Sequence, residues 1–420
     1  MPAPRYKWYV VGMLWWICFF NYADRQAIFS VFPLLEKEFG LTLEQLGWLG
    51  SSFGLVYGLC APFVGRVVDR VRRKSAILGG LHAWSAICMA TALSRGFGQL
   101  LFFRAAEGLG ETFYFPASMS LMSDYHGKAT RSRALGLHQT SVYVGTIAGG
   151  YFAGLVGQRY GWRWSFVVFG GLGILLGLVL RRYLIEPQRG AADTTFAEVS
   201  GAVTKANPRP SGSGVSARLT PTLVILLAAF LCANFVAVVV LTWMPKFLYD
   251  KFHLSLAAAG LTATVFIQLA SMVGSPAGGW LADRLRARRP GGRMMVQAAG
   301  LLCGAPFVVL CGLTQSIAWL LVALTAWGFF KGLYDANIFA AMFDVVPPES
   351  RGAATGLMNM VGWLGGGGAA PVMIGYIAER HGLGFAIALA SAVYVAGAAV
   401  LIAGILLFIR RDAARREPAR

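Results

Sequence analysis

Charged residues are scarce in this sequence of 420 residues. Asp, Glu, Lys and Arg make up 13% of the chain and hydrophobic residues 56%, whereas soluble domains ordinarily carry about 25% charged residues. Acidic residues are fewer than basic ones, 19 against 37, which gives a net charge of +18. The scarcity of charge excludes a series of soluble domains.

Motifs of several other protein classes are missing. The six cysteines all lie in apolar runs and include no CxxC pair, so neither a disulfide framework nor a zinc site is indicated. The first apolar run is too long for a cleavable signal peptide and lacks a small-residue cleavage site. The stretch "GGGG" at 365–368 is not followed by the Lys-Ser/Thr of a phosphate-binding loop. We expect no cofactor and no metal.

Long apolar runs fill the chain instead. A helix of about 20 apolar residues crosses a bilayer, and the runs contain Gly and Pro, which such helices tolerate. The sequence therefore predicts an all-α membrane protein with twelve transmembrane helices, at about residues 8–35, 45–66, 75–94, 97–122, 134–157, 163–183, 220–248, 256–282, 294–313, 316–343, 352–378 and 383–409.

Basic residues are distributed unevenly between the two sides of the predicted membrane. With the N-terminus in the cytoplasm, 27 of the 37 basic residues lie in cytoplasmic segments, seven in external segments and three within spans. Short cytoplasmic loops carry such an excess of Lys and Arg. We therefore expect both termini to be cytoplasmic, with the positive charge facing anionic lipids rather than nucleic acid. We expect a monomer in the cell (plasma or inner) membrane.

Two sets of residues recur in both halves of the chain, with displacements of 214 and 220 positions. They are Gly65, Asp69 and Arg70 with Gly279, Asp283 and Arg284, and Asp124, Arg131, Ala134, Gly136 and Leu137 with Asp344, Arg351, Ala354, Gly356 and Leu357. A polar stretch rich in Gly, Pro and Ser separates the halves. The sequence thus predicts two pseudo-symmetric six-helix bundles, 1–183 and 220–420, joined by a cytoplasmic linker over 184–219, which is a transporter architecture.

Ionisable residues lie inside the predicted spans. The stretch "NYADRQ" at 21–26 places Asp24 beside Arg25, and Arg104, Glu107 and Glu111 lie in the fourth span. An ionised group at the bilayer centre costs about 3 kcal/mol on insertion scales, so it normally faces a cavity or a partner. The last three residues are spaced i, i+3 and i+7 and share a helix face. We expect this group to line a central cavity.

Two carboxylates on adjacent turns repel each other, so at least one of Glu107 and Glu111 is expected to bind a proton near neutral pH. Arg25 offers a planar fork that holds a carboxylate with two hydrogen bonds. Purely structural ion pairs remain the alternative, Arg104 with Glu107 and Arg25 with a neighbour in the bundle.

Residues 65–74, "GRVVDRVRRK", resemble the signature of the major facilitator superfamily between its second and third helices. Gly65, Asp69 and Arg70 match the signature, whereas Arg72 stands where a glycine is usual. Within the superfamily the chain is similar to the anion:cation symporters, which take up organic anions with protons. The matching residues are "NYADR", Tyr57, Arg104, Gly108, Glu111, Pro116, "LTWMPKFL" and Asn359.

The resemblance implies roles for these residues. The counterparts of Asp24 and Glu111 take part in proton coupling, and that of Arg25 in anion binding. Glu107 lies outside the family pattern, and we count it as a third proton-coupling candidate. Substrate binding is expected from Arg25, Tyr57, Arg104, Asn359 and Tyr22.

A cytoplasmic gate is expected where the charged signature residues meet. Salt bridges among them would hold the halves together when the carrier is open to the outside. The predicted gate residues are Gly65, Asp69, Arg70, Arg131, Asp283, Arg284 and Arg351. Lys331 and Asp335 are spaced i, i+4 and are expected to form a local ion pair.

The sequence therefore predicts a proton-coupled symporter of small organic anions, such as sugar acids or other monocarboxylates, that works by alternating access. "NYADR" and "GLGE" also resemble the spinster-like transporters, so a carrier of lysolipids or other amphiphiles is the alternative. A membrane sensor that transports nothing is a further rival. "GSSFG" at 50–54 has the spacing of a serine-hydrolase motif, with His82 or His138 as a base, but it begins a predicted span. We expect no enzyme.

Overall fold

The computed structural model describes residues 5–127, 130–188, 220–289, 291–347 and 350–408, without the side chains of Asp69 and Ser132. Regular structure in these ranges is entirely helical. Most of the expected linker, 189–219, lies outside the described residues. Residues 1–4 and 409–420 also lie outside.

Helices cover each of the twelve expected apolar stretches, in several cases as two or three consecutive elements. The elements of the first half are α1 (Tyr6–Ser30), α2 (Phe32–Phe39), α3 (Leu43–Arg70), α4 (Arg73–Thr91), α5 (Phe97–Glu111), α6 (Tyr114–Tyr125), α7 (Arg131–Tyr160) and α8 (Trp162–Tyr183). Those of the second half are α10 (Pro221–Phe252), α11 (Leu256–Arg286), α12 (Gly292–Leu313), α13 (Ile317–Asp335), α14 (Ile338–Val345), α15 (Arg351–Gly362), the π-helix η2 (Trp363–Ala369), α16 (Ala370–His381), α17 (Leu383–Leu389) and α18 (Ser391–Leu407).

Local sequence signals set several helix boundaries. Thr42 and Gln45 form a capping box that starts α3, because their side chains satisfy backbone groups that the first turn leaves free. Ser255 caps α11 through its hydroxyl, which accepts a hydrogen bond from the amide of Ala258. Gly40, with a φ of +62°, ends α2 in the left-handed conformation that glycine adopts without strain.

Eight stretches are long and apolar enough to cross a membrane, among the described residues. They comprise α3, α8, α10, α11, α12, α13 with α14, α15 through α16, and α17 with α18. The other four expected spans fall on α1, α4, α5 with α6, and α7. α1 and α5 carry the buried ionisable residues, which lower their apolar content. The number of twelve spans stays a prediction.

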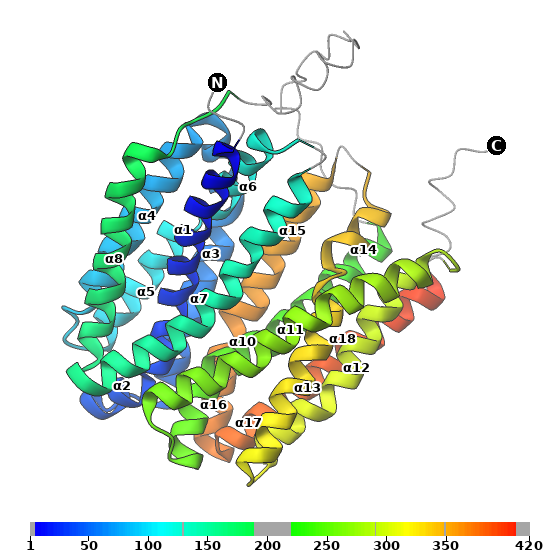
Figure 1. The fold of residues 1–420 in the computed structure, drawn as a ribbon. Helices are drawn as coiled ribbons and strands as arrows, with labels where there is room; N and C mark the ends of the chain where they lie inside the picture. The colour runs from blue at the N-terminus through cyan, green and yellow to red at the C-terminus, as the bar shows by residue number, and fades with distance from the viewer. Residues whose placement is uncertain (1–4, 128–129, 189–219, 290, 348–349, 409–420) are drawn as a thin grey trace.

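The helices form two bundles, one from α1 to α8 and one from α10 to α18, that lie side by side (Figure 1). We call the end where the N-terminus and the ends of α3, α6 and α8 lie the linker end. The opposite end, at α2, α16 and α17, is the far end (Figure 1). The site described below lies between the two bundles.

The displacement of 220 positions recurs in three dimensions. Arg73 at the start of α4 forms an ion pair with Asp124, and Arg293 at the start of α12 forms one with Asp344 at 2.9 Å. The guanidinium of Arg131 donates to the Ser123 carbonyl at 3.2 Å, and that of Arg351 to the Phe343 carbonyl at 3.2 Å. Each residue of the second half lies 220 positions after its counterpart. The two halves thus repeat contacts as well as sequence.

The bundles meet closely at the far end. A Cβ added to Gly150 of α7 would lie 2.6 Å from the carbonyl oxygen of Gly260 in α11, and one added to Gly47 of α3 would lie 2.6 Å from that of Pro371 in α16. Only glycine allows two helices to approach this closely. The molecule is therefore closed at the far end.

The ribbons of the two bundles diverge toward the linker end (Figure 1). Cβ atoms added to Gly65, Gly136, Gly279 and Gly356 would meet nothing within 4 Å. All four glycines belong to the repeated sets, which lie in this half of the molecule's length. These four glycines therefore lack the close contacts between the bundles that Gly47 and Gly150 make at the far end, and we take the linker end as the open side.

Candidate functional site

A cavity of about 480 Å³ lies between the two bundles and is lined by residues of both. The first half contributes Arg25 and Arg104, and the second Lys331 and Asp335. Amide side chains add hydrogen-bonding groups on both sides: Gln26, Gln139, Asn234, Gln268 and Asn359. The cavity thus combines cationic groups with many neutral donors and acceptors, which suits a small polar anion.

Arg25 occupies the centre of an aromatic box. Its guanidinium carbon lies 4.8 to 5.2 Å from the ring centres of Tyr22, Phe53, Tyr57 and Trp363. The face of an aromatic ring attracts a cation electrostatically. The box holds the guanidinium in one place while 11% of the side chain stays exposed. Two predicted substrate residues, Tyr22 and Tyr57, therefore lie against the predicted anion-binding group.

Glu111 completes the surroundings of Arg25. Its carboxylate accepts a hydrogen bond from Nε of Arg25 and is fully buried. Sequence reasoning placed both residues in one cavity without foreseeing the pair. Because Nε is engaged, a substrate carboxylate at Arg25 would have to compete with Glu111.

Arg104 and Glu107 form a second ion pair within α5, with both side chains almost fully buried. This is the contact that the structural alternative describes. One atom of each partner, Nε of Arg104 and Oε1 of Glu107, nevertheless has no hydrogen-bond partner. The pair thus leaves one donor and one acceptor unsatisfied in a buried place.

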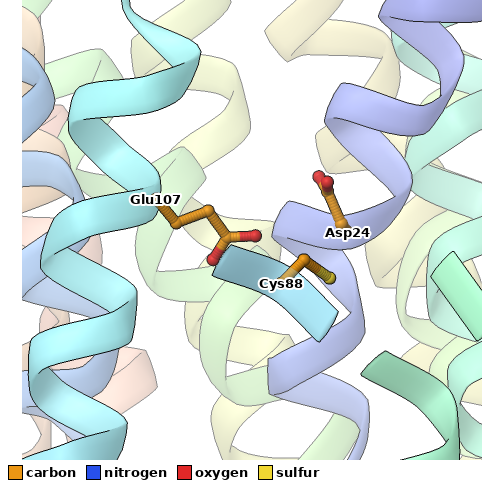
Figure 2. A group of neighbouring side chains, drawn as sticks. All are labelled: Asp24, Cys88 and Glu107. Carbon is orange, nitrogen blue, oxygen red and sulfur yellow. The ribbon is translucent and has the colours of Figure 1, made fainter. Parts of the chain in front are cut away.

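Asp24 lies close to side chains of α4 and α5. Ligand atoms of Asp24, Cys88 and Glu107 lie within 4.8 Å of one another (Figure 2). Asp24 is 3% exposed and its Oδ1 atom has no hydrogen-bond partner. The three side chains could hold a small cation, although no metal was expected from the sequence.

Trp363 was missed by sequence reasoning. It lies four residues after Asn359, so the two share a face of the span, and this spacing was the available signal. It begins the π-helix η2, and such turns often mark functional sites. Through Trp363 the second half reaches the guanidinium of the first.

The second half places three predicted residues at the cavity. Asn359 lines it, as expected. Lys331 and Asp335 form the expected ion pair, and both line the cavity as well. A second lysine was missed: Lys246, 2% exposed, pairs with Glu36 of α2 and with Asp250, at 2.8 Å from the latter. A charged residue within "LTWMPKFL" was the signal.

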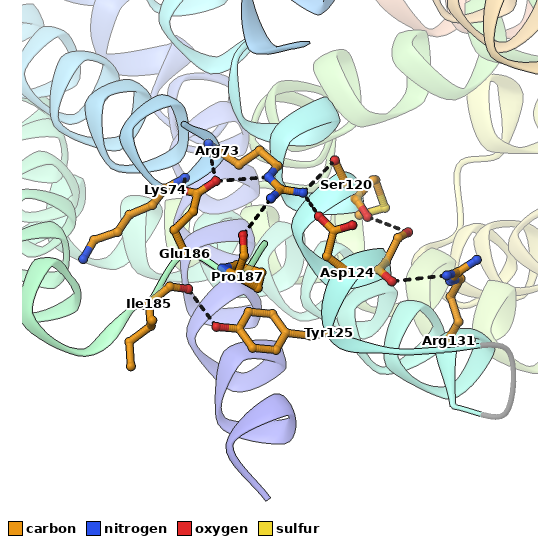
Figure 3. A network of polar contacts seen from close by, with 11 residues as sticks. Arg73, Lys74, Ser120, Asp124, Tyr125, Arg131, Ile185, Glu186 and Pro187 are labelled. Carbon is orange, nitrogen blue, oxygen red and sulfur yellow. Dashed lines mark hydrogen bonds and ion pairs between the residues drawn. The ribbon is translucent and has the colours of Figure 1, made fainter. Parts of the chain in front are cut away.

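The predicted gate residues lie at the linker end. Arg131 donates to the carbonyls of His126 and Ser123. Arg73, which sequence reasoning left out of the gate, has a larger network: it pairs with Asp124 and, at 3.1 Å, with Glu186 (Figure 3). The partners named here belong to the first half or to the start of the linker segment. The side chain of Asp69 lies outside what the structure describes.

The second half shows the equivalent arrangement. Asp283 pairs with Arg293 at 2.9 Å, and Arg284 lies over the Trp280 ring at 5.5 Å. Arg351 contacts Phe343, and Arg70 is exposed. Among the described residues, each ion pair found at this end therefore joins elements of one half, as expected where the bundles stand apart.

The serine-hydrolase alternative is not supported. Ser52 lies within the continuous helix α3 and donates to the carbonyl of Leu49, so the strand-to-helix elbow of that motif is missing here. His82 donates to the carbonyl of Leu78 at 2.6 Å. His138 lies 2.7 Å from the hydroxyl of Tyr114. Both histidines have local partners and lie outside the cavity lining.

Comparisons with known proteins agree with this geometry. The sequence is 27% identical over 400 residues to a probable galactarate/D-glucarate transporter of Bacillus subtilis, covering 90% of this chain and 86% of that protein. It is 26% identical over 395 residues to the protein spinster of Drosophila melanogaster, covering 89% of this chain and 62% of that protein.

A solved structure shares the fold. A bacterial homologue of the human lysosomal transporter spinster, solved in an inward-facing and occupied conformation, superposes with a TM-score of 0.83 at 21% sequence identity. The match covers 98% of this chain and 99% of that one. The model of the Major Facilitator Superfamily matches residues 14–370 and 291–420. The two-bundle fold, the repeated signature residues and this match together show that the chain belongs to the Major Facilitator Superfamily.

Proposed function

We propose that this protein is a proton-coupled symporter of small organic anions, with sugar acids or other monocarboxylates as its substrates. The observation that carries the proposal is that Arg25 lines a cavity shared by both halves and pairs with Glu111, which is fully buried behind it. It supplies an anion-binding group and a carboxylate that competes for that group.

The competition supplies the coupling. A substrate carboxylate that binds Arg25 displaces Glu111, which is then a buried carboxylate without its partner. Such a group costs several kcal/mol unless it takes up a proton. Binding of the anion and of a proton therefore favour each other. Release of the proton would return Glu111 to Arg25 and expel the anion.

Alternating access would use the two ends of the molecule. The close glycine contacts at the far end would separate while the repeated charged residues at the linker end come together. The predicted gate residues, Asp69 and Arg70 with Arg131 and their counterparts, would then bridge the halves. Trp363 links the two events, because it contacts the anion-binding arginine from the second half.

Sugar acids fit the rest of the lining. A hydroxylated chain needs several hydrogen bonds, and the five amide side chains provide donors and acceptors from both halves of the molecule. Relatives described as sugar-acid transporters support this choice, among them the D-galactonate transporter of Escherichia coli, 25% identical over 394 residues.

The test is uptake into proteoliposomes. Purified protein is reconstituted, and labelled galactonate or glucarate is offered with an acidic exterior and a neutral interior. We expect accumulation above the external concentration that a protonophore abolishes. Uptake that a protonophore leaves unchanged would contradict coupling. Failure of counterflow with every sugar acid tested would favour a sensor that transports nothing.

An amphiphile carrier is the second candidate. Phe29, Phe53, Phe115, Phe230 and Phe339 line the same cavity, and rings of this kind accept an acyl chain as readily as a sugar face. The relatives named spinster support it. Transport of a labelled lysophospholipid, with no response to sugar acids, would replace the first proposal by this one.

Orientation and location belong to the same proposal. The excess of basic residues in the linker-end segments would place that end, and both termini, in the cytoplasm of the cell membrane. The open side of this structure would then face inward. Labelling of a cysteine placed at exposed Arg70 from the cytoplasmic side alone, in a cysteine-free background, tests this orientation.

A further inference from the structure

The buried charges at the site do not balance. Three acids, Asp24, Glu107 and Glu111, face two guanidiniums, Arg25 and Arg104, and Arg104 and the three acids are at most 3% exposed. Two ion pairs account for four of these charges. One acid is left over. If all five groups are ionised, the cluster carries one uncompensated negative charge.

The atoms that lack partners mark where the missing charge belongs. Oδ1 of Asp24, Oε1 of Glu107 and Oε1 of Glu111 have no hydrogen-bond partner although all three side chains are buried, and of the three acids Asp24 is the one that the two ion pairs leave out. A carboxylate oxygen of Asp24 on α1 and one of Glu107 on α5 lie within 4.8 Å of each other, with Cys88 of α4 beside them (Figure 2). Two acceptors that face each other in a dry site repel unless something positive lies between them.

The surrounding groups do not supply that charge. The charged groups that act on Asp24 are Glu111, Glu107, Arg25 and Arg104, and those that act on Glu107 are the two arginines. From α3 the nearest titratable neighbour of the cluster is Tyr57, which faces Arg25. From α4 it is Cys88, whose thiol donates to the Phe166 carbonyl of α8. Both are neutral in their ordinary forms.

A proton suits this place better than a metal ion. Sodium and other hard cations require several oxygen ligands, whereas two carboxylates and a soft sulfur converge here. A proton needs only two oxygens, which a change of side-chain torsion would bring from within 4.8 Å into contact, and a hydrogen bond between a carboxyl and a carboxylate is short and strong.

We propose that Asp24 and Glu107 hold one proton between them, beside Cys88, and that this proton stays in the carrier throughout the transport cycle. The inference rests on the proposed function for the meaning of that cycle. It separates the three acids: Glu111 exchanges the transported proton, and the Asp24–Glu107 pair stores another.

The same count applies to the loaded carrier. When a substrate carboxylate replaces Glu111 at Arg25, neutrality requires one added proton, which Glu111 takes from water. The proton between Asp24 and Glu107 is needed in both states. The net number of protons carried per substrate charge is therefore one, and the stored proton does not contribute to it.

Infrared spectroscopy of the substrate-free protein tests the stored proton directly. A protonated carboxyl absorbs at a higher carbonyl frequency than a carboxylate does. We expect such a band in the wild type at neutral pH, shifted by exchange into D₂O. Asp24→Asn and Glu107→Gln should each remove it, because either change leaves two acids for two arginines.

Two variants provide controls. Asp335→Asn removes a cavity carboxylate that is already balanced by Lys331, so the band should persist. Cys88→Ala should shift the band without removing it, because the thiol lies beside the pair but carries no charge. A band unchanged in Glu107→Gln would overturn the proposal, and so would its loss in sodium but not in potassium.

The transport ratio separates this inference from the proposed function. The number of protons carried per substrate is obtained from the membrane potential at which net flux stops. Glu107→Gln should keep the wild-type ratio while lacking the infrared band. A ratio reduced by one in Glu107→Gln would show that the stored proton is transported, which overturns this inference and leaves symport intact. The infrared experiment tests the stored proton even if no transport substrate is found, because it uses the substrate-free protein.

Discussion

Lys246 of α10 forms an ion pair with Glu36 of α2, so a buried lysine of the second half is held by a carboxylate of the first at the closed far end. Asp250, one turn further along α10, lies 2.8 Å from the same ammonium group. Among the ion pairs of the described residues, this is the one that joins the two bundles. Separation of the bundles at the far end would break it.

Loss of this ion pair should shift the carrier toward the state that is open at the far end. Glu36→Gln removes a half-exposed partner, and we expect an effect of about 1 kcal/mol, or roughly fivefold in the ratio of the two states. Spin labels at exposed Arg159 and Arg380, in a cysteine-free background, would report longer distances. Lys37→Gln, on the same helix, is the control and should leave the distances unchanged.

Arg25→Lys should weaken binding of a sugar acid at least tenfold although the charge is kept. Lysine lacks the planar fork that holds a carboxylate with two hydrogen bonds and stacks on aromatic rings, and the aromatic box is built around a guanidinium. Calorimetry or thermal shift with the acid measures the effect. Arg163→Lys, at a far-end surface pair with Glu38, is the matched control. Wild-type affinity in Arg25→Lys would remove this residue from the binding site.

Glu111→Gln should abolish accumulation but retain exchange. The amide imitates the protonated carboxyl permanently, so Arg25 remains available to the substrate and the loaded carrier still reorients. Exchange of labelled for unlabelled substrate moves no net proton, whereas accumulation requires it. Proteoliposomes with and without a proton gradient separate the two activities. Glu44→Gln, at the start of α3, should keep both, and loss of exchange in Glu111→Gln would indicate a binding role instead.

Asp69→Asn should favour the state that is open at the linker end. If the gate residues bridge the halves when that end closes, removal of one charge destabilises the closed form and leaves the open form, seen here, unaffected. The labels at Arg159 and Arg380 would then report a smaller fraction of the longer distance in the presence of substrate. An unchanged fraction would show that Asp69 is not part of the gate.

Arg73→Ala should destabilise the protein more than Arg293→Ala does. Arg73 is 2% exposed and holds both Asp124 and Glu186, whereas the side chain of Arg293 is 17% exposed. Removal of one partner of a buried ion pair costs about 3 kcal/mol, and the more exposed site should lose roughly 1 kcal/mol. The melting temperature in detergent measures both. Arg72→Ala, at the exposed neighbouring position, should have little effect.

Much of the site followed from one rule, that an ionisable residue inside an apolar run needs a cavity or a partner. That rule located Arg25, Glu111 and Arg104. Helix periodicity predicted the shared face of Arg104 and Glu107, and these two residues do pair.

Contacts between helices were not predictable in this way. Cys88 looked like ordinary packing, because nothing in its own span shows that Asp24 and Glu107 lie beside it. Lys246 and Glu36 lie 210 positions apart, and neither bundle alone contains the pair. The ion pairs of Arg73 and Arg293 were within reach, since both residues obey the displacement of 220 already seen for Asp124 and Asp344. The spacing of residues along a helix predicts which of them share a face. Tertiary packing decides which other helix that face contacts.

The glycine contacts at the far end have a consequence for leakage. Gly150 lies against the backbone of Gly260, and Gly47 lies against the backbone of Pro371 and Val372, so the seam there is backbone on backbone. Such a seam leaves no space for a file of water molecules, along which protons would otherwise pass from one face to the other. A carrier driven by a proton gradient must not dissipate that gradient while its cavity is open to one side. The seam therefore keeps protons from leaking across the closed end. A single methyl group added there would push the two helices apart, and we expect it to make the resting membrane permeable to protons.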